Sequence, residues 1–173
     1  MPDSPQLEAY RVVRTETSLA GAGADVATPE AAVAALYDVL SGPAERERAR
    51  DWDRLRSLML PGARFLICHG WDDEGRPTRE LREWDIEGFV TDARAIYREQ
   101  GFWEREIAGR TDRFGAVAHR FSSYESRVGS EASEPVGRGV NSIQLVRHAG
   151  RWWIASVVWD TERPDRPIPE QYL

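Results

Sequence analysis

The second half of the chain alternates between apolar and polar residues with a period of two, in four segments of at least nine residues each. This alternation is the pattern of a β-strand that buries one of its faces. Phe114-Gly115 and Ala149-Gly150 are short turn sequences, and residues 128–137 form a polar loop. The pattern therefore predicts four long antiparallel strands, at Phe102–Asp112, Ala116–Arg127, Gly139–Arg147 and Arg151–Thr161.

The first half carries helical spacing instead. Thr28-Pro29-Glu30 is a helix start, because Thr caps free N–H groups, Pro suits the first helical position and Glu faces the positive end of the helix dipole. Apolar residues then recur at helical spacing up to Leu40, and Ser41-Gly42-Pro43 ends the helix. The other elements predicted here are a helix from Ala44 or Asp51 to Leu60 that Pro61-Gly62 ends, a strand pair at Ala63–Cys68 and Pro77–Trp84, and a helix from Asp85 to Gly101.

Helices followed by a run of antiparallel strands is the order of an α+β protein. We expect one domain over residues 28–173, in which a curved, mostly antiparallel sheet wraps around about three helices, and in which the Pro-rich tail lies extended over the body. Residues 1–27 show no sustained period, and they are predicted to form a flexible N-terminal arm.

Composition excludes several classes of protein. The 41% hydrophobic residues and seven Trp exclude a disordered chain, and no apolar run approaches the roughly 18 residues of a membrane-spanning helix. The net charge of −6 argues against nucleic acid or an anionic membrane as a partner. Cys68 is the only cysteine in the sequence and has no partner for an internal disulfide, so we expect a reducing compartment, the cytoplasm.

Four stretches resemble a known family. They are Arg50–Leu58, Gly139–Leu145, Gly150–Ile154 and the tail Pro167–Leu173, and together with the element order they are similar to the nuclear transport factor 2-like superfamily. This α+β cone, of cystatin-like fold, includes ketosteroid isomerases and polyketide cyclases of the SnoaL type. The resemblance implies a deep apolar pocket between the sheet and the helices and a homodimer formed through the outer sheet face. It implies nothing specific about function, since this fold serves enzymes, binding proteins and dimerisation modules.

Three polar residues occupy positions compatible with a pocket. His119 lies in a predicted strand and would act as a general acid or base if it faced inward, the alternative being an ordinary hydrogen-bonded histidine. Tyr37 lies on the apolar stripe of the first helix, either as packing or, as the resemblance to the isomerases implies, as a partner for an oxyanion. Asn141 is either a polar anchor in an apolar cavity or a solvated sheet position.

These residues lead to a functional hypothesis. We expect an apolar or aromatic small molecule to bind in a pocket formed by Tyr37, Phe65, Trp84, Phe89, His119 and Asn141. If the protein is an enzyme, we expect cofactor-free isomerase, cyclase or dehydratase chemistry with His119 and Tyr37 as catalytic residues, although no carboxylate was found on an apolar face in the first half of the chain. The alternative is a non-catalytic dimerisation or ligand-binding module whose pocket its own side chains fill.

Neither a cofactor nor a metal is expected. His69, Asp72 and Asp73 lie close together in the sequence, but they lack the spacing of a metal site.

Two further expectations concern the faces of the sheet. A two-residue turn at Ala149-Gly150 places the following residues on one face: Asn141, Ile143, Leu145, Trp152, Ile154, Ser156 and Val158. The consecutive Trp152 and Trp153 must serve both faces, so something should cover the outer face. This predicts a homodimer independently of the resemblance.

Overall fold

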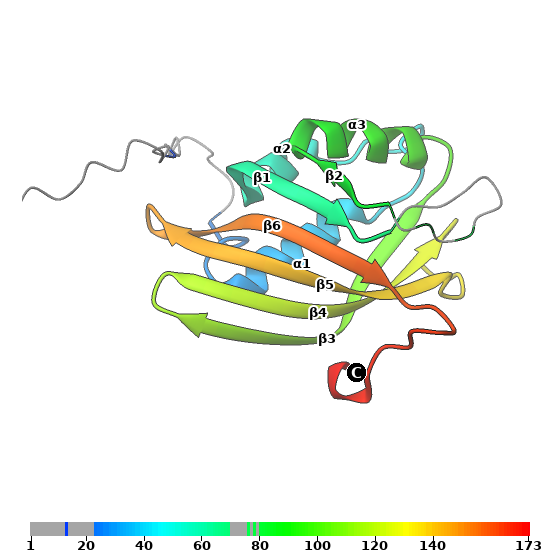
Figure 1. Cartoon of the computed structure of the whole chain (residues 1–173). Helices are drawn as coiled ribbons and strands as arrows, with labels where there is room; N and C mark the ends of the chain where they lie inside the picture. The colour runs from blue at the N-terminus through cyan, green and yellow to red at the C-terminus, as the bar shows by residue number, and fades with distance from the viewer. Residues whose placement is uncertain (1–12, 14–22, 70–75, 77, 79) are drawn as a thin grey trace, which may run out of the picture.

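A curved sheet with helices against one of its faces forms the body of the protein (Figure 1). The computed structural model describes residues 13, 23–69, 76, 78 and 80–173. The elements in chain order are α1 (Pro29–Leu40), α2 (Trp52–Leu58), β1 (Met59–Ile67), β2 (Arg82–Trp84), α3 (Ile86–Tyr97), β3 (Phe102–Phe114), β4 (Val117–Val128), β5 (Gly137–His148), β6 (Arg151–Thr161) and the short 3₁₀ helix η1 (Glu170–Tyr172). The predicted α+β class is confirmed.

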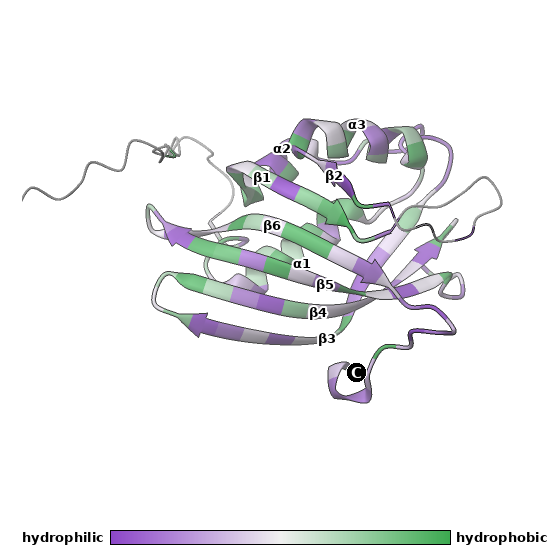
Figure 2. Cartoon of the chain, in the orientation of Figure 1, coloured by the Kyte–Doolittle hydropathy of each residue, from purple (hydrophilic) through white to green (hydrophobic). Residues whose placement is uncertain are grey.

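The strands follow the order β2-β1-β6-β5-β4-β3. All neighbours are antiparallel except β1 and β6, which run parallel. Hydropathy varies across this sheet, with β3 mostly polar at one edge and long apolar segments on β6 (Figure 2). The core lies between the helices and the inner face, and its largest fully buried side chains include Leu36, Phe65, Ile143 and Ile154.

The predicted helix caps are present. Thr28 Oγ1 accepts a hydrogen bond from the Ala31 N–H at 3.1 Å at the start of α1, and Asp85 Oδ1 accepts one from the Gly88 N–H at 2.8 Å at the start of α3. The second helix is shorter than predicted, because Met59 and Leu60 already belong to β1. Gly62 does not end a helix; its φ of +91° lies in an irregularity of β1, where the pairing with β6 shifts.

A bulge in β6 overturns part of the predicted face assignment. Leu145 pairs with Ile154, but Gln144 pairs with Ser156, so Ala155 is an extra residue. Because side chains alternate along a strand, the extra residue reverses the faces beyond it. Asn141 therefore pairs with Trp159, which faces inward, and the predicted approach of Asn141 to Ser156 and Val158 is wrong.

The argument from consecutive tryptophans is also wrong. Trp152 and Trp153 are 2% and 3% exposed in the isolated chain. The Arg151 guanidinium lies 3.9 Å from the centre of the Trp153 ring. Since Trp153 is already covered within one chain, its burial requires no second copy.

The C-terminal tail covers part of the outer face. Ser123 Oγ donates a hydrogen bond to the Tyr172 carbonyl at 2.6 Å, and the Phe121 and Tyr172 rings lie 4.7 Å apart. Ile168 is buried. The tail therefore lies against the outer face, but it is not extended along its whole length, because it turns between Arg163 and Arg166 before η1.

Most of the predicted arm, residues 1–27, lies outside the described residues. Its last residues pack on the domain: Val26 is buried in the core and its carbonyl accepts from the Trp152 N–H at 3.0 Å, while Asp25 pairs with Arg54 at 2.8 Å. In the described part of the chain, no helix has the length and apolar character needed to cross a membrane.

A buried arginine holds the end of α1 in place. The Arg50 guanidinium donates to the carbonyls of Leu40, Gly42 and Pro43 at 2.9, 3.0 and 3.2 Å, and it lies 4.2 Å from the centre of the Tyr97 ring. Carbonyls at a helix C-terminus have no partner within the helix, so this side chain supplies donors that the backbone lacks.

We predict that Arg50→Lys lowers the free energy of unfolding by about 2 kcal/mol, because an ammonium cannot serve three separated carbonyls and stack on a ring. Urea denaturation measures this. Arg46→Lys is the control, since Arg46 is an exposed surface residue, and it should be neutral. Equal stability of the two variants would contradict a structural role for Arg50.

Candidate functional site

An apolar cavity of about 370 Å³ lies between the inner sheet face and helices α1 and α3. Its volume is in the range of small-molecule sites. Most of its lining is apolar or aromatic: Leu36, Leu40, Phe65, Ile67, Trp84, Phe89, Ala93, Ile96, Tyr97, Phe102, Tyr124, Val157 and Trp159. Its polar lining residues are Asp92, Glu104, Ser126, Asn141 and Thr161.

Aromatic rings form two walls of this cavity. The Phe65 and Phe89 rings stack at 3.9 Å with an interplanar angle of 10°, and the Trp84 and Trp159 rings are near-parallel at 6.0 Å. Trp84 is further held by a hydrogen bond from its Nε1–H to Asp92 Oδ2 at 2.7 Å. These walls suit a flat, apolar ligand.

Two carboxyl groups line the described part of the cavity, Asp92 and Glu104, and Asp92 accepts the hydrogen bond from Trp84. Glu104 lies on β3, where its side chain points inward beside Phe102. Burial raises the pKa of Glu104 from the ordinary 4.5 to about 7, and the hydrogen bond from Asn141 Nδ2 at 3.5 Å opposes this only in part. Among the described residues, no cationic side chain forms an ion pair with Glu104. A carboxyl in this state accepts or donates a proton near neutral pH.

Asn141 belongs to an oriented chain of hydrogen bonds. Its Nδ2 donates to the Tyr37 hydroxyl at 3.0 Å, and the Tyr37 and Ser122 hydroxyls lie 2.7 Å apart. Ser122 Oγ donates to Glu106 Oε2 at 2.5 Å, and Glu106 pairs with Arg120. Because Ser122 gives its proton to Glu106, the Tyr37 hydroxyl must donate to Ser122. The chain therefore turns the Asn141 amide N–H₂ toward Glu104.

Tyr37 stays protonated in this arrangement. Burial, together with the nearby Glu104 charge, raises the pKa of the phenol well above its ordinary value. The phenol therefore orients Asn141 and does not itself ionise near neutral pH.

A second, more polar cavity of about 500 Å³ lies on the other side of this chain, between α1 and the edge strand β3. Glu104 borders both cavities, which is why it keeps some accessible surface despite its apolar surroundings. The second cavity also contains Tyr37 and Glu106. Glu104 therefore lies between an apolar cavity and a more polar one.

The structure brings together most of the residues predicted for the pocket. Phe65, Trp84, Phe89 and Asn141 line the apolar cavity. Tyr37 is placed behind Asn141 and borders the second cavity.

His119 is the exception, and its predicted inward orientation is wrong. It lies on the outer sheet face, where its Nε2 is 2.9 Å from Ser142 Oγ and its ring is 6.0 Å from that of Phe121. Its neighbours in the strand, Ala118 and Arg120, face inward. The predicted roles of His119 in the cavity are therefore not supported.

Sequence reasoning missed Glu104 and Thr161. A signal for Glu104 was available, because the strand that begins at Phe102 places residue 104 on the same face as Phe102. The inward position of Thr161 depends on the bulge at Ala155. Among the described residues, no group of His, Cys, Asp or Glu has the arrangement of a metal site. Asp72 and Asp73, considered above as ligands, lie outside the described residues.

No protein-family profile matches the sequence, and no curated protein matches it. Solved structures do match the fold. A cystatin-like protein of unknown function from Nostoc punctiforme aligns with a TM-score of 0.55 at 11% identity, over 82% of this chain and 98% of that one. A candidate dehydratase of the nuclear transport factor 2-like family from Streptomyces avermitilis aligns at 0.53 and 13% identity, over 76% and 91%. The fold is nuclear transport factor 2-like.

A further match with this fold is a candidate Ca/calmodulin-dependent kinase II association domain from Exiguobacterium sibiricum, at a TM-score of 0.54 and 12% identity, over 78% of this chain and 91% of that one. At such identities the likeness shows the fold alone. The function must therefore be argued from the site.

We predict that Glu104→Gln removes a pH-dependent loss of stability. A carboxyl whose pKa is raised in the folded state stabilises it below the unfolded pKa, and that stability is lost as the pH rises from about 4.5 to about 7. The loss is of the order of 3 kcal/mol. Urea denaturation at pH 5 and pH 8 should show Glu104→Gln gaining stability relative to wild type only at the higher pH.

Glu99→Gln is the matched control, because Glu99 is an exposed surface residue. It should follow the wild-type pH dependence. A Glu104→Gln variant that shows the wild-type dependence would mean that Glu104 ionises as an ordinary carboxyl.

Proposed function

We propose that this protein binds an apolar small organic molecule in the cavity and transfers a proton to or from it without a cofactor, with Glu104 as the general base and acid. The observation that supports this most is a carboxyl with a pKa of about 7 in a mostly apolar cavity. A catalytic base works best when its pKa is close to the operating pH. A protein that only stored an apolar ligand would need no such group.

The proposed reaction is a proton shift on carbon next to a carbonyl group. Ionised Glu104 removes the proton from carbon, the electron pair moves onto the carbonyl oxygen, and the same carboxyl returns the proton to another carbon of the conjugated system. One N–H of Asn141 stays bonded to Tyr37, and the other moves from its long contact with Glu104 to the carbonyl oxygen as negative charge develops there. Tyr37 acts through Asn141, so it is a positioning residue in this scheme.

The alternative is a non-catalytic module with a filled pocket. One structure with the same fold is named as an association domain, so the fold also occurs in proteins of that description. In such a module, aromatic side chains of the protein itself would fill the pocket. The open volume of about 370 Å³ favours ligand binding.

Ligand binding is tested first. A thermal-shift panel of aromatic, terpenoid, steroid and polyketide-like compounds is run on wild type and on Ala93→Phe, which places a ring in the cavity. We predict that hits raise the melting temperature of the wild type by a few degrees at concentrations about tenfold above Kd, and that Ala93→Phe loses them. His119→Ala should keep every hit, because His119 lies on the opposite face.

Catalysis is then tested with a carbonyl-containing hit from this panel. In D₂O, NMR should show exchange of the hydrogens next to its carbonyl at a rate that rises with pH through about 7, as Glu104 ionises. Glu104→Gln should reduce the exchange at least a hundredfold. Exchange that persists in Glu104→Gln, or hits that Ala93→Phe retains, would each contradict the proposal.

We also retain the proposal of a cytoplasmic homodimer formed through the outer sheet face. It is supported by the apolar pair Val117 and Val146, adjacent on that face, of which Val117 is 54% exposed. Sedimentation equilibrium of wild type and Val117→Glu measures it. A wild type that stays monomeric at tens of micromolar concentration would overturn it.

A further inference from the structure

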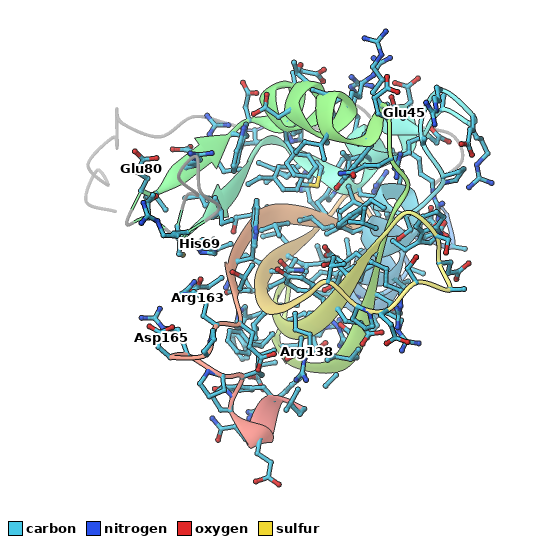
Figure 3. The ribbon with its side chains drawn as sticks, turned by 90° about the vertical axis from the view of Figure 1, so that its right-hand side faces the viewer. Glu45, His69, Glu80, Arg138, Arg163 and Asp165 are labelled. Carbon is cyan, nitrogen blue, oxygen red and sulfur yellow. The ribbon has the colours of Figure 1, made fainter. Side chains whose placement is uncertain are left out.

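A buried histidine lies beside the cavity, outside the machinery described so far. His69 follows the end of β1 and is 3% exposed. Its Nδ1 is 2.8 Å from Asp160 Oδ1, and its Nε2 is 3.0 Å from Thr161 Oγ1. Figure 3 shows His69 at this end of the sheet, with Arg163 on the segment that follows β6. The three side chains Asp160, His69 and Thr161 therefore form a line that ends at a hydroxyl.

The charges around Asp160 fix the direction of this line. Arg163 and Arg166 donate to its carboxylate at 2.7 and 3.0 Å. Burial alone would raise the pKa of Asp160, but these hydrogen bonds lower it to about 2, so the group remains an anion. Arg163 Nη1 also lies 3.3 Å from His69 Nδ1, but Asp160 Oδ1 is closer, at 2.8 Å, and an ionised carboxylate only accepts hydrogen bonds. The His69 Nδ1 therefore carries a proton and donates it to Asp160.

The Thr161 hydroxyl contacts His69 Nε2 at 3.0 Å. A hydroxyl oxygen has two lone pairs, and one contact with an imidazole nitrogen occupies at most one of them. The Thr161 oxygen therefore accepts a hydrogen bond from a third group whichever of the two atoms donates in this contact.

Thr161 lines the apolar cavity. Asn141 pairs with Trp159 across β5 and β6, and Thr161 pairs with Gly139, one inward position farther along the sheet. Asn141 is the residue that contacts Glu104. The cavity thus has Glu104 and Asn141 as one polar group and Thr161 as another, with the Trp159 ring at the position between them.

We propose that Thr161, held by His69 and Asp160, is a second polar subsite of the cavity, which accepts a hydrogen bond from a hydroxyl or N–H group of the ligand. This inference rests on the proposed function, because it assumes that the cavity takes an apolar ligand. It narrows the ligand to a flat apolar compound with two polar groups. One polar group meets Glu104 and Asn141, and the other is a hydrogen-bond donor that meets Thr161.

Two naphthalene derivatives test the subsite by calorimetry. Naphthalene-2,6-diol carries a hydroxyl at both ends, and 6-methoxy-2-naphthol lacks the donor at one end. We expect the diol to bind wild type at least tenfold more tightly, which is the effect of one well-placed hydrogen bond with the statistical advantage of a symmetric ligand. In Thr161→Val, a variant of the same shape, the ratio should fall to about twofold, and Thr161→Ser should restore it.

The outcomes separate this inference from the proposed function. The ratio compared is that of the dissociation constants of the two naphthols. If both compounds bind, but this ratio is about twofold in wild type or stays at tenfold in Thr161→Val, the subsite is overturned. The proposed apolar site is then unaffected. If neither naphthol binds wild type, binding of flat apolar ligands in the cavity is itself contradicted, and the subsite with it. Circular dichroism of both variants verifies that they are folded.

Discussion

A carboxyl group inside an apolar cavity is the constraint around which this interior is arranged. Glu104 and Glu106 are two residues apart on one strand, yet their surroundings are opposite. Glu106 has Arg120 and a hydrogen bond from Ser122. In the part of the chain that the structure describes, Glu104 has one long hydrogen bond from an amide and no cation. A buried carboxylate without a cation costs free energy, and this cost raises the pKa of Glu104 to about 7.

The same polar chain also fixes the position of α1. Tyr37 is a residue of this helix whose hydroxyl lies between Ser122 on β4 and Asn141 on β5. Both strands are held by one side chain, and each donor has an acceptor, so sliding of the helix would leave buried polar groups unpaired. The same hydrogen bonds of Tyr37 therefore stabilise the helix–sheet packing and orient the Asn141 amide.

Gly139 leaves the space that Tyr124 occupies in the cavity wall. A Cβ at Gly139 would lie 2.5 Å from the Tyr124 hydroxyl oxygen and equally close to the Asp160 carbonyl. No side chain fits there without moving the backbone. Gly139 thus lets Tyr124 lie against the sheet, as part of the cavity wall.

The sequence predicted the elements well, because caps and periodicity are local signals. It failed for the face of β4, for a physical reason. The prediction placed His119 in the pocket, yet the inner face of β4 carries Arg120 and Ser122, which belong to the hydrogen-bond chain that ends at Glu106. The outward Phe121 is covered by Tyr172 of the tail. Hydropathy identifies the inner face of a strand only where the core alone buries apolar side chains. In this protein the C-terminal tail also covers an apolar side chain, on the outer face of β4.

The bulge at Ala155 determines most of what the cavity is able to recognise. Without this extra residue, Trp159 and Thr161 would both point to the outer face, and Val158 would point inward. One inserted residue thus supplies an aromatic wall, opposite Trp84, and a hydroxyl at the far end. The rings restrict the plane of a ligand and the polar groups restrict its length and direction. Because the bulge places both, the site depends on the register of β6, and a prediction that assumes regular strands does not find it.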